Sequence, residues 1–178
     1  MNPQIIIQKY YREGSRLYDI FMSHAESVAG RSVELTKKHP ELEMDVDFVY
    51  EAAMLHDIGI FLTDAPKIDC FGIHPYICHG YLGAELLQQE GYPEHALVCE
   101  RHTGTGISLN QIITNDLPLP HQDMQPQTLE EQLICFVDIF YSKTKLGKIK
   151  EITNIREKML TTGRGSVTKF DNWCNLFL

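Results

Sequence analysis

Apolar residues recur at helical spacing along most of this chain, and this periodicity is the feature that most restricts its fold. Intervals of three and four residues between apolar positions return repeatedly, whereas the alternating pattern of a half-buried strand is nearly absent. Helices with one apolar face must bury that face against a neighbour. A chain of 178 residues is long enough to build one such core. We therefore predict an all-α, single-domain helical bundle of about seven helices.

Capping residues and helix breakers set the expected boundaries. Ser15, Ser166 and Thr128, which opens the capping box TLEE, are suitable N-caps. Gly59 and Gly163 are suitable ends, because glycine readily follows the last helical turn. The predicted helices span about residues 15–38, 47–59, 77–90, 93–102, 128–143, 148–161 and 166–177.

We expect a single domain from residue 1 to residue 178, since no repeat, low-complexity tract or linker divides the sequence. The motifs described below lie in a core of about residues 15–145, and the helices of about 148–178 are expected to pack on it. Two long connections rich in glycine and proline remain, at residues 60–76 and 103–127. Long loops in compact domains often carry function.

The apolar faces of four successive predicted helices carry, or end in, a histidine: His24, His56, His79 and His102. One inward-facing histidine is usually a hydrogen-bonded core residue, but four in succession favour a shared site. Two aspartates join them, because Asp57 follows His56 directly and Asp138 interrupts the apolar stretch LICFVDIFY. A lone buried carboxylate is strongly disfavoured, and a divalent cation would offset its charge.

These residue types point to a pair of divalent metal ions. Imidazole and carboxylate ligands together suit iron, manganese, zinc, cobalt or nickel. Successive residues on a helix point about 100° apart, so His56 and Asp57 cannot face the same way. Six ligands are too many for one catalytic ion that keeps open positions. We therefore predict two ions that share Asp57, one held by His24, His56 and Asp138 and the other by His79 and His102.

The ordered set resembles the HD-domain superfamily of metal-dependent phosphohydrolases. The residues that carry the resemblance are His24, the HDIG sequence at 56–59 and Asp138. HG at 79–80, followed by LGAELL, and RHTG at 101–104 resemble the members that bind two metals. The combination HGYLGAELL…ERHTG is most similar to small bacterial HD hydrolases related to the symmetrical diadenosine tetraphosphate hydrolases.

This resemblance implies a hydrolase in which a metal-activated hydroxide cleaves a phosphoester or phosphoanhydride bond. The expected substrate is a small nucleotide or another phosphorylated metabolite. Asp57 and Lys143 are the predicted catalytic residues. The side chains expected to bind the substrate are Lys67, Lys143, Arg101 and Arg164.

Two other functions remain open at this stage. The same six ligands occur in HD-fold di-iron oxygenases that act on a small polyol or phosphonate, and spacing alone does not separate them from the hydrolases. A nucleotide-binding regulatory HD module is the third hypothesis, although such modules are expected to lack ligands that this chain retains.

Charge, cysteine content and hydropathy limit the expected binding partners and the expected cellular location. The net charge of −8 disfavours duplex nucleic acid as a partner. Five cysteines without CxxC spacing predict reduced, mostly buried thiols. With no apolar run of membrane-spanning length and too short an apolar core for a signal peptide, we expect a cytoplasmic protein that does not bind a membrane. The stripe Phe170, Trp173 and Phe177 is expected in the core or at a homodimer face.

Overall fold

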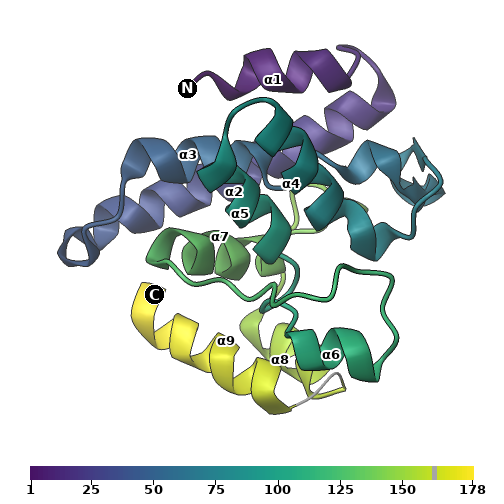
Figure 1. Ribbon diagram of the computed structural model, residues 1–178. Helices are drawn as coiled ribbons and strands as arrows, with labels where there is room; N and C mark the ends of the chain where they lie inside the picture. Colours follow the sequence, from purple (N-terminus) through teal and green to yellow (C-terminus); the bar gives the residue numbers. More distant parts are fainter. Residues whose placement is uncertain (162–163) are drawn as a thin grey trace.

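The computed structural model describes residues 1–161 and 164–178, and helices dominate this part of the chain (Figure 1). The described residues contain nine α-helices: α1 (Pro3–Tyr10), α2 (Arg16–Lys38), α3 (Val46–Leu55), α4 (His79–Gln89), α5 (Pro93–Arg101), α6 (Leu109–Thr114), α7 (Leu129–Phe140), α8 (Ile152–Leu160) and α9 (Arg164–Phe177). A two-stranded antiparallel hairpin, β1 (Asp64–Ala65) and β2 (Cys70–Phe71), is their only sheet. The predicted all-α fold is confirmed.

The central helices begin where their capping residues place them. The Ser15 hydroxyl accepts a hydrogen bond from the main-chain N–H of Tyr18, which fixes the start of α2. The Thr128 hydroxyl accepts one from the N–H of Glu131 and starts α7 in the same way. Pro93 occupies the first turn of α5, where its missing N–H costs nothing.

These helices pack as one bundle around a shared core. Helix α2 lies against α3 and α7, α4 lies against α5, and α5 also contacts α3 and α7. In Figure 1, α1 lies above this bundle, while α8 and α9 lie below α7. Helix α9 packs on α7 through buried rings: Phe177 and Phe170 both contact Phe136. The predicted stripe on the last helix therefore faces the core.

The predicted extent of the fifth and sixth helices is wrong, because the fifth ends earlier and the sixth begins later than predicted. Helix α7 ends at Phe140 rather than at Lys143, because Tyr141 turns to an extended conformation. The Lys150 main-chain N–H donates to the carbonyl of Phe140, and its amine donates to the carbonyl of Ile139. The last carbonyls of α7 thus find partners outside the helix. Helix α8 begins at Ile152 instead of about residue 148, because Glu151 is extended at the N-cap position.

The observed boundaries of three other helices differ from the predicted ones by a few residues, and two short helices were not predicted. Helix α3 spans residues 46–55 rather than 47–59, capped by Asp45, and α4 begins at 79 rather than 77. Helix α9 begins at Arg164, two residues before the predicted cap Ser166. The predicted end at Gly163 lies outside the described residues. Helix α1, and α6 inside the second predicted loop, had no counterpart in the prediction.

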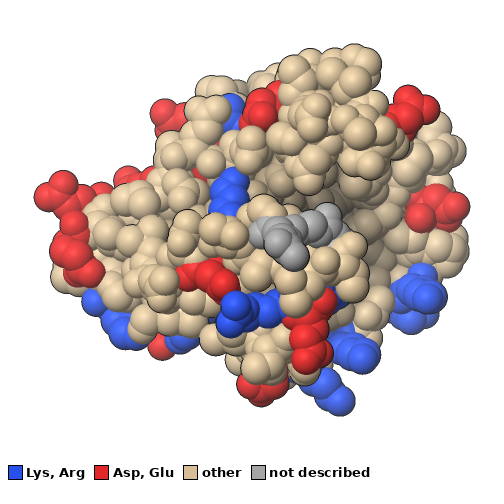
Figure 2. Space-filling view, turned by 90° about the horizontal axis from the view of Figure 1, so that it is seen from below, with Lys and Arg blue, Asp and Glu red and all other residues tan. Residues whose placement is uncertain are grey.

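Charged side chains are dispersed on the face of the molecule that Figure 2 shows. Lysine and arginine side chains gather along the lower edge of this view, with acidic side chains among them and on the upper and outer parts. That face therefore offers no continuous basic surface. Within the described ranges, no helix has both the length and the apolar character needed to cross a membrane.

Candidate metal centre

The six predicted ligands come from five places in the fold and meet at one point. His24 lies in the middle of α2, and Asp138 lies in the last turn of α7. His56 and Asp57 directly follow α3. His79 opens α4, and His102 directly follows α5. Their ligand atoms form two groups that share Asp57: His24, His56, Asp57 and Asp138, and Asp57, His79 and His102.

The first group joins both aspartates to two imidazoles. The Nε2 atom of His24 lies 2.9 Å from Oδ1 of Asp138 and 3.2 Å from Oδ2 of Asp57. The Nε2 atom of His56 lies 3.0 Å from the same Asp57 oxygen and 3.3 Å from Nε2 of His24. Asp57 is fully buried, whereas the Asp138 side chain is 17% exposed. The Asp138 carboxylate therefore connects the buried centre to the surface.

The second group uses the other oxygen of Asp57. His79 and His102 each place Nε2 3.4 Å from Oδ1 of Asp57. Their two Nε2 atoms lie 3.0 Å apart. Donor atoms that share one ion at about 2.0–2.2 Å lie roughly 2.8–3.6 Å from one another. Both groups therefore have the spacing of ligands around a cation.

Main-chain carbonyls fix the orientation of three of the rings. Nδ1 of His56 donates to the carbonyl of Ala53 at 2.6 Å, and Nδ1 of His102 donates to that of Cys99 at 2.7 Å. Nδ1 of His79 donates to the carbonyl of Tyr76, also at 2.7 Å. A carbonyl only accepts, so Nδ1 carries a hydrogen in each of these rings, and Nε2 is the nitrogen directed at the centre, where it can bind metal when the ring is neutral.

This arrangement fits a metal ion better than it fits a hydrogen-bonded core. Two unprotonated nitrogens 3.0 Å apart, as in His79 and His102, repel one another unless a cation or proton lies between them. Neutral histidines anchored through the other ring nitrogen are typical metal ligands. The centre is therefore a buried cluster of histidine and aspartate able to hold metal.

Gly59 allows helix α4 to approach the turn that carries His56 and Asp57. A Cβ atom on Gly59 would lie 2.4 Å from the carbonyl oxygen of His79 and 2.5 Å from the nitrogen of Gly83. The prediction that Gly59 ends the helix is wrong, because α3 already ends at Leu55, and the φ of Gly59 is −86°, which is not a left-handed conformation. The glycine is needed because only hydrogen fits between the two segments.

Lys143 places a positive charge at the centre. Its amine lies 2.6 Å from Oδ2 of Asp57. Burial raises the pKa of Asp57, but Lys143 and His56 outweigh it and hold that pKa well below its ordinary value. Burial lowers the pKa of Lys143, and Asp57 more than reverses this, so the pKa is raised. Both groups are therefore charged at neutral pH.

His56 and His79 have different electrostatic surroundings. Burial acts to lower the pKa of His56, but Asp57 and Asp138 outweigh it and raise that pKa to about 10. Burial and the neighbouring His102 lower the pKa of His79 to about 3. His79 therefore stays neutral, in the protonation state that metal binding requires.

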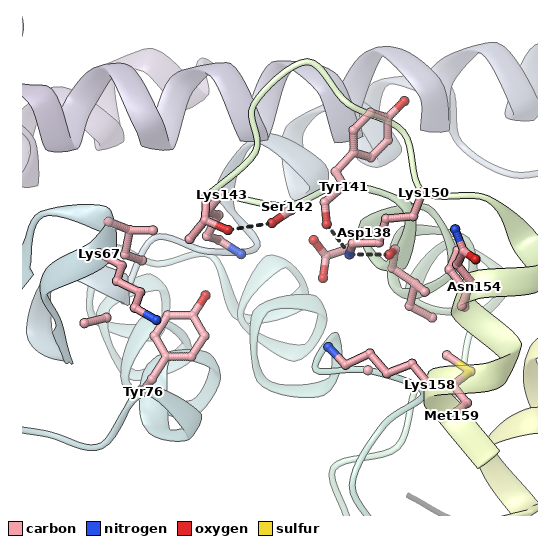
Figure 3. A pocket seen from close by; sticks show the side chains of 16 residues that line it. Lys67, Tyr76, Asp138, Tyr141, Ser142, Lys143, Lys150, Asn154, Lys158 and Met159 are labelled. Carbon is pink, nitrogen blue, oxygen red and sulfur yellow. Dashed lines mark hydrogen bonds between the residues drawn. The ribbon is translucent and has the colours of Figure 1, made fainter. Parts of the chain in front are cut away.

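The predicted substrate-binding residues lie in different surroundings. Lys143 and Lys67 both line a cavity that reaches Asp138 (Figure 3). Arg101 does not line it, because Nη1 of Arg101 lies 3.0 Å from Oε1 of the buried Glu131. The side chain of Arg164 lies outside the described residues.

Several residues around the centre were not predicted from the sequence. The ring of Tyr76 stacks on that of His79 at 4.7 Å and lies under the amine of Lys143. Lys150 and Lys158 line the same cavity. Lysines beside an apolar helix carry no distinctive sequence signal, whereas Tyr76, which lies three residues before a predicted ligand, was recognisable as a neighbour of the site.

Comparisons with known proteins find a matching family model and several similar chains. A family model described as HD domain matches residues 21–142. An uncharacterized protein of Methanocaldococcus jannaschii is 33% identical over 151 residues, which are 83% of this chain and 82% of that protein. No match to this chain is found among solved structures.

Two further relatives are considerably longer than the matched segment, and both are named tRNA (cytidine(56)-2'-O)-methyltransferase. The protein of Thermoplasma volcanium is 28% identical over 153 residues, 85% of this chain but 40% of its own length. The protein of Picrophilus torridus is 29% identical over 135 residues, 75% of this chain and 35% of its own length.

Proposed function

Because the chain belongs to the HD domain family, we propose that it is a metal-dependent phosphohydrolase. It would cleave a phosphoester or phosphoanhydride bond of a small nucleotide or another phosphorylated metabolite. The observation that carries the proposal is the pair of ligand groups that share Asp57 beside an open, lysine-lined cavity. Two-metal sites of this kind are suited to in-line displacement at phosphorus.

We propose two divalent ions, drawn from iron, manganese, zinc, cobalt and nickel, since the mixed nitrogen and oxygen donors suit these metals. Asp57 would contribute one carboxylate oxygen to each ion, with His24, His56 and Asp138 completing one site and His79 and His102 the other. When bound, the ions would supply Lewis acidity and a water molecule with a lowered pKa.

Lys143 is suited to bind the negative charge of the reacting phosphate. Its amine lies beside Asp57 and also lines the cavity, so it can contact a phosphate oxygen without leaving the metal centre. A fixed ammonium at this position stabilises the charge that develops during displacement. Lys67 lies on another wall of the cavity and is proposed to bind a more distant part of the substrate. Arg101 would have to leave Glu131 to contribute.

The direct test combines metal loading with a substrate screen. The purified chain is loaded with manganese, iron or cobalt, and phosphate release is measured from nucleotides and phosphorylated metabolites. Asp57→Ala is expected to lower the rate at least about a thousandfold, because it removes the group shared by both sites. Asp47→Ala, an exposed carboxylate in the first turn of α3, is the matched control and should retain the rate.

The same assay separates the other functions. A hydrolase releases phosphate at the same rate under nitrogen and under air, whereas a di-iron oxygenase turns over only while it consumes oxygen. A regulatory module binds a nucleotide without releasing phosphate. Full activity of Asp57→Ala would contradict the proposed mechanism, and oxygen-dependent turnover would replace it with the oxygenase.

A further inference from the structure

The cavity beside the metal centre is larger than a single phosphate requires. Its volume is about 630 Å³, within the ~300–1,000 Å³ typical of small-molecule sites. Asp138 and Lys143 lie where it meets the metal centre, and Lys158 and Asn154 of α8 line a different wall (Figure 3). Ile68, with other apolar side chains, forms much of the remaining lining. The cavity therefore has room for an organic body beyond the reacting phosphate.

The charge of this cavity is opposite to that of the chain as a whole. The chain carries a net charge of −8. Among the described residues, the charged side chains that line the cavity are four lysines, Lys67, Lys143, Lys150 and Lys158, and a single carboxylate, Asp138. That carboxylate belongs to the proposed metal centre, where a cation would neutralise it. The rest of the cavity is therefore suited to an anion.

Two of the four lysines already have partners. The amine of Lys143 lies 2.6 Å from Asp57, and the amine of Lys150 donates to the main-chain carbonyls of Ile139 and Tyr141. By contrast, the side-chain amines of Lys67 and Lys158 form no ion pair or hydrogen bond with another residue in the described ranges. In Figure 3 the amines of Lys67 and Lys158 extend into the cavity from opposite sides. These two ammonium groups are free to bind a ligand.

We propose that the substrate carries a second phosphate group, separate from the one at the metal centre, and that Lys158 and Lys67 bind it. The position of the first phosphate rests on the proposed function. Lysine is a suitable residue here, because a mobile ammonium binds phosphate as a point charge and does not need the fixed geometry of arginine. The substrate class is thus a small bisphosphorylated compound, with an organic body against Ile68 and its apolar neighbours.

Binding to matched probes tests this proposal without requiring turnover. Affinities of the full chain for AMP and for adenosine 3′,5′-bisphosphate are measured by calorimetry. The bisphosphate is expected to bind at least about tenfold more tightly, the effect of one added charge-assisted contact. In the double variant Lys67→Gln, Lys158→Gln this ratio should fall to about one, while AMP affinity changes less than about twofold. Lys148→Gln, an exposed lysine outside the cavity lining, should keep the ratio.

The possible failures are distinguishable. An unchanged ratio in the double variant, an equal loss of affinity for both probes, or no binding of either probe would overturn the second phosphate site. Failure of the proposed function is detected in the phosphate-release screen, where the metal-loaded wild-type chain would release no phosphate from any substrate. If the wild-type chain releases phosphate but binds the bisphosphate no more tightly than AMP, the proposed function stands and only the second phosphate site is refuted.

Discussion

Replacement of Gly59 by alanine tests whether the close approach of α4 to the HDIG turn holds the metal centre together. The new Cβ would lie 2.4 Å from the His79 carbonyl oxygen, against an ordinary contact of at least 3.4 Å, a shortfall of about 1 Å. Because the colliding atoms of His79 and Gly83 belong to the main chain, no side chain can rotate away. Helix α4 must therefore move, and His79 moves with it.

The expected cost follows from this overlap. Overpacking typically destabilises by about 1–3 kcal/mol, and a main-chain collision belongs at the upper end. For a chain of this size, about 3 kcal/mol lowers Tm by roughly 6–12 °C. The displaced imidazole should also weaken metal binding by about tenfold or more, even though all six ligands remain.

Gly30→Ala is the matched control for thermal unfolding followed by circular dichroism. Gly30 lies inside α2, and a Cβ atom there meets nothing within 4 Å. Alanine at this position should raise Tm by a few degrees, because it favours the helix by about 1 kcal/mol. If Gly59→Ala melts at or above the wild-type temperature, the close-packing explanation of the HDIG glycine is refuted.

Three shorter predictions follow from burial and charge. Glu131→Gln should cost about 2–3 kcal/mol in urea unfolding, because it removes the closer carboxylate from Arg101 and leaves only Glu100, whose Oε2 lies 3.9 Å from Nε of Arg101. A cost below about 1 kcal/mol would refute a structural role for the pair. In the presence of a chelator, the free energy of unfolding should fall between about pH 7 and pH 10. The pKa of His56 is about 10 in the folded chain and about 6.5 in the unfolded chain, so the proton that stabilises the folded chain is lost as the pH rises. His56→Gln should remove this pH dependence of the free energy of unfolding. An unchanged pH dependence would contradict its assignment to His56. Phe177→Ala should cost about 3–5 kcal/mol and keep a single unfolding transition, since this ring packs on Phe136 in the common core; two transitions would show that α9 unfolds separately.

The sequence was informative where helical periodicity and unusual chemistry coincide. Four histidines on apolar helical faces, with Asp138 inside an apolar run, predicted a cluster that the structure brings together with Asp57 at its centre. The starts of α2 and α7 followed from their capping residues, and the start of α5 followed from Pro93 in its first turn. These features depend on local sequence, so local rules predict them.

The features missed depend on contacts between distant segments. The end of α7 is set by Lys150, which lies beyond the helix and bonds to its last carbonyls. The need for Gly59 comes from α4, not from its own backbone conformation. Helix α6 had a readable signal, since Ser108 and Gln111 form a capping box, but it lies in a segment rich in glycine and proline. Lys158 lines the cavity because α8 packs against α7, and this contact between separate helices is not apparent from local sequence.

The number of metal ions bound by matched variants tests the central claim most directly. After loading and removal of free metal, elemental analysis should find two ions per wild-type chain. The variant His102→Ala should retain one ion and Asp57→Ala should retain none, while His121→Ala, at an exposed histidine, should retain both. A wild-type chain that binds no metal, or an Asp57→Ala variant that still binds two ions, would contradict a centre organised around the shared aspartate.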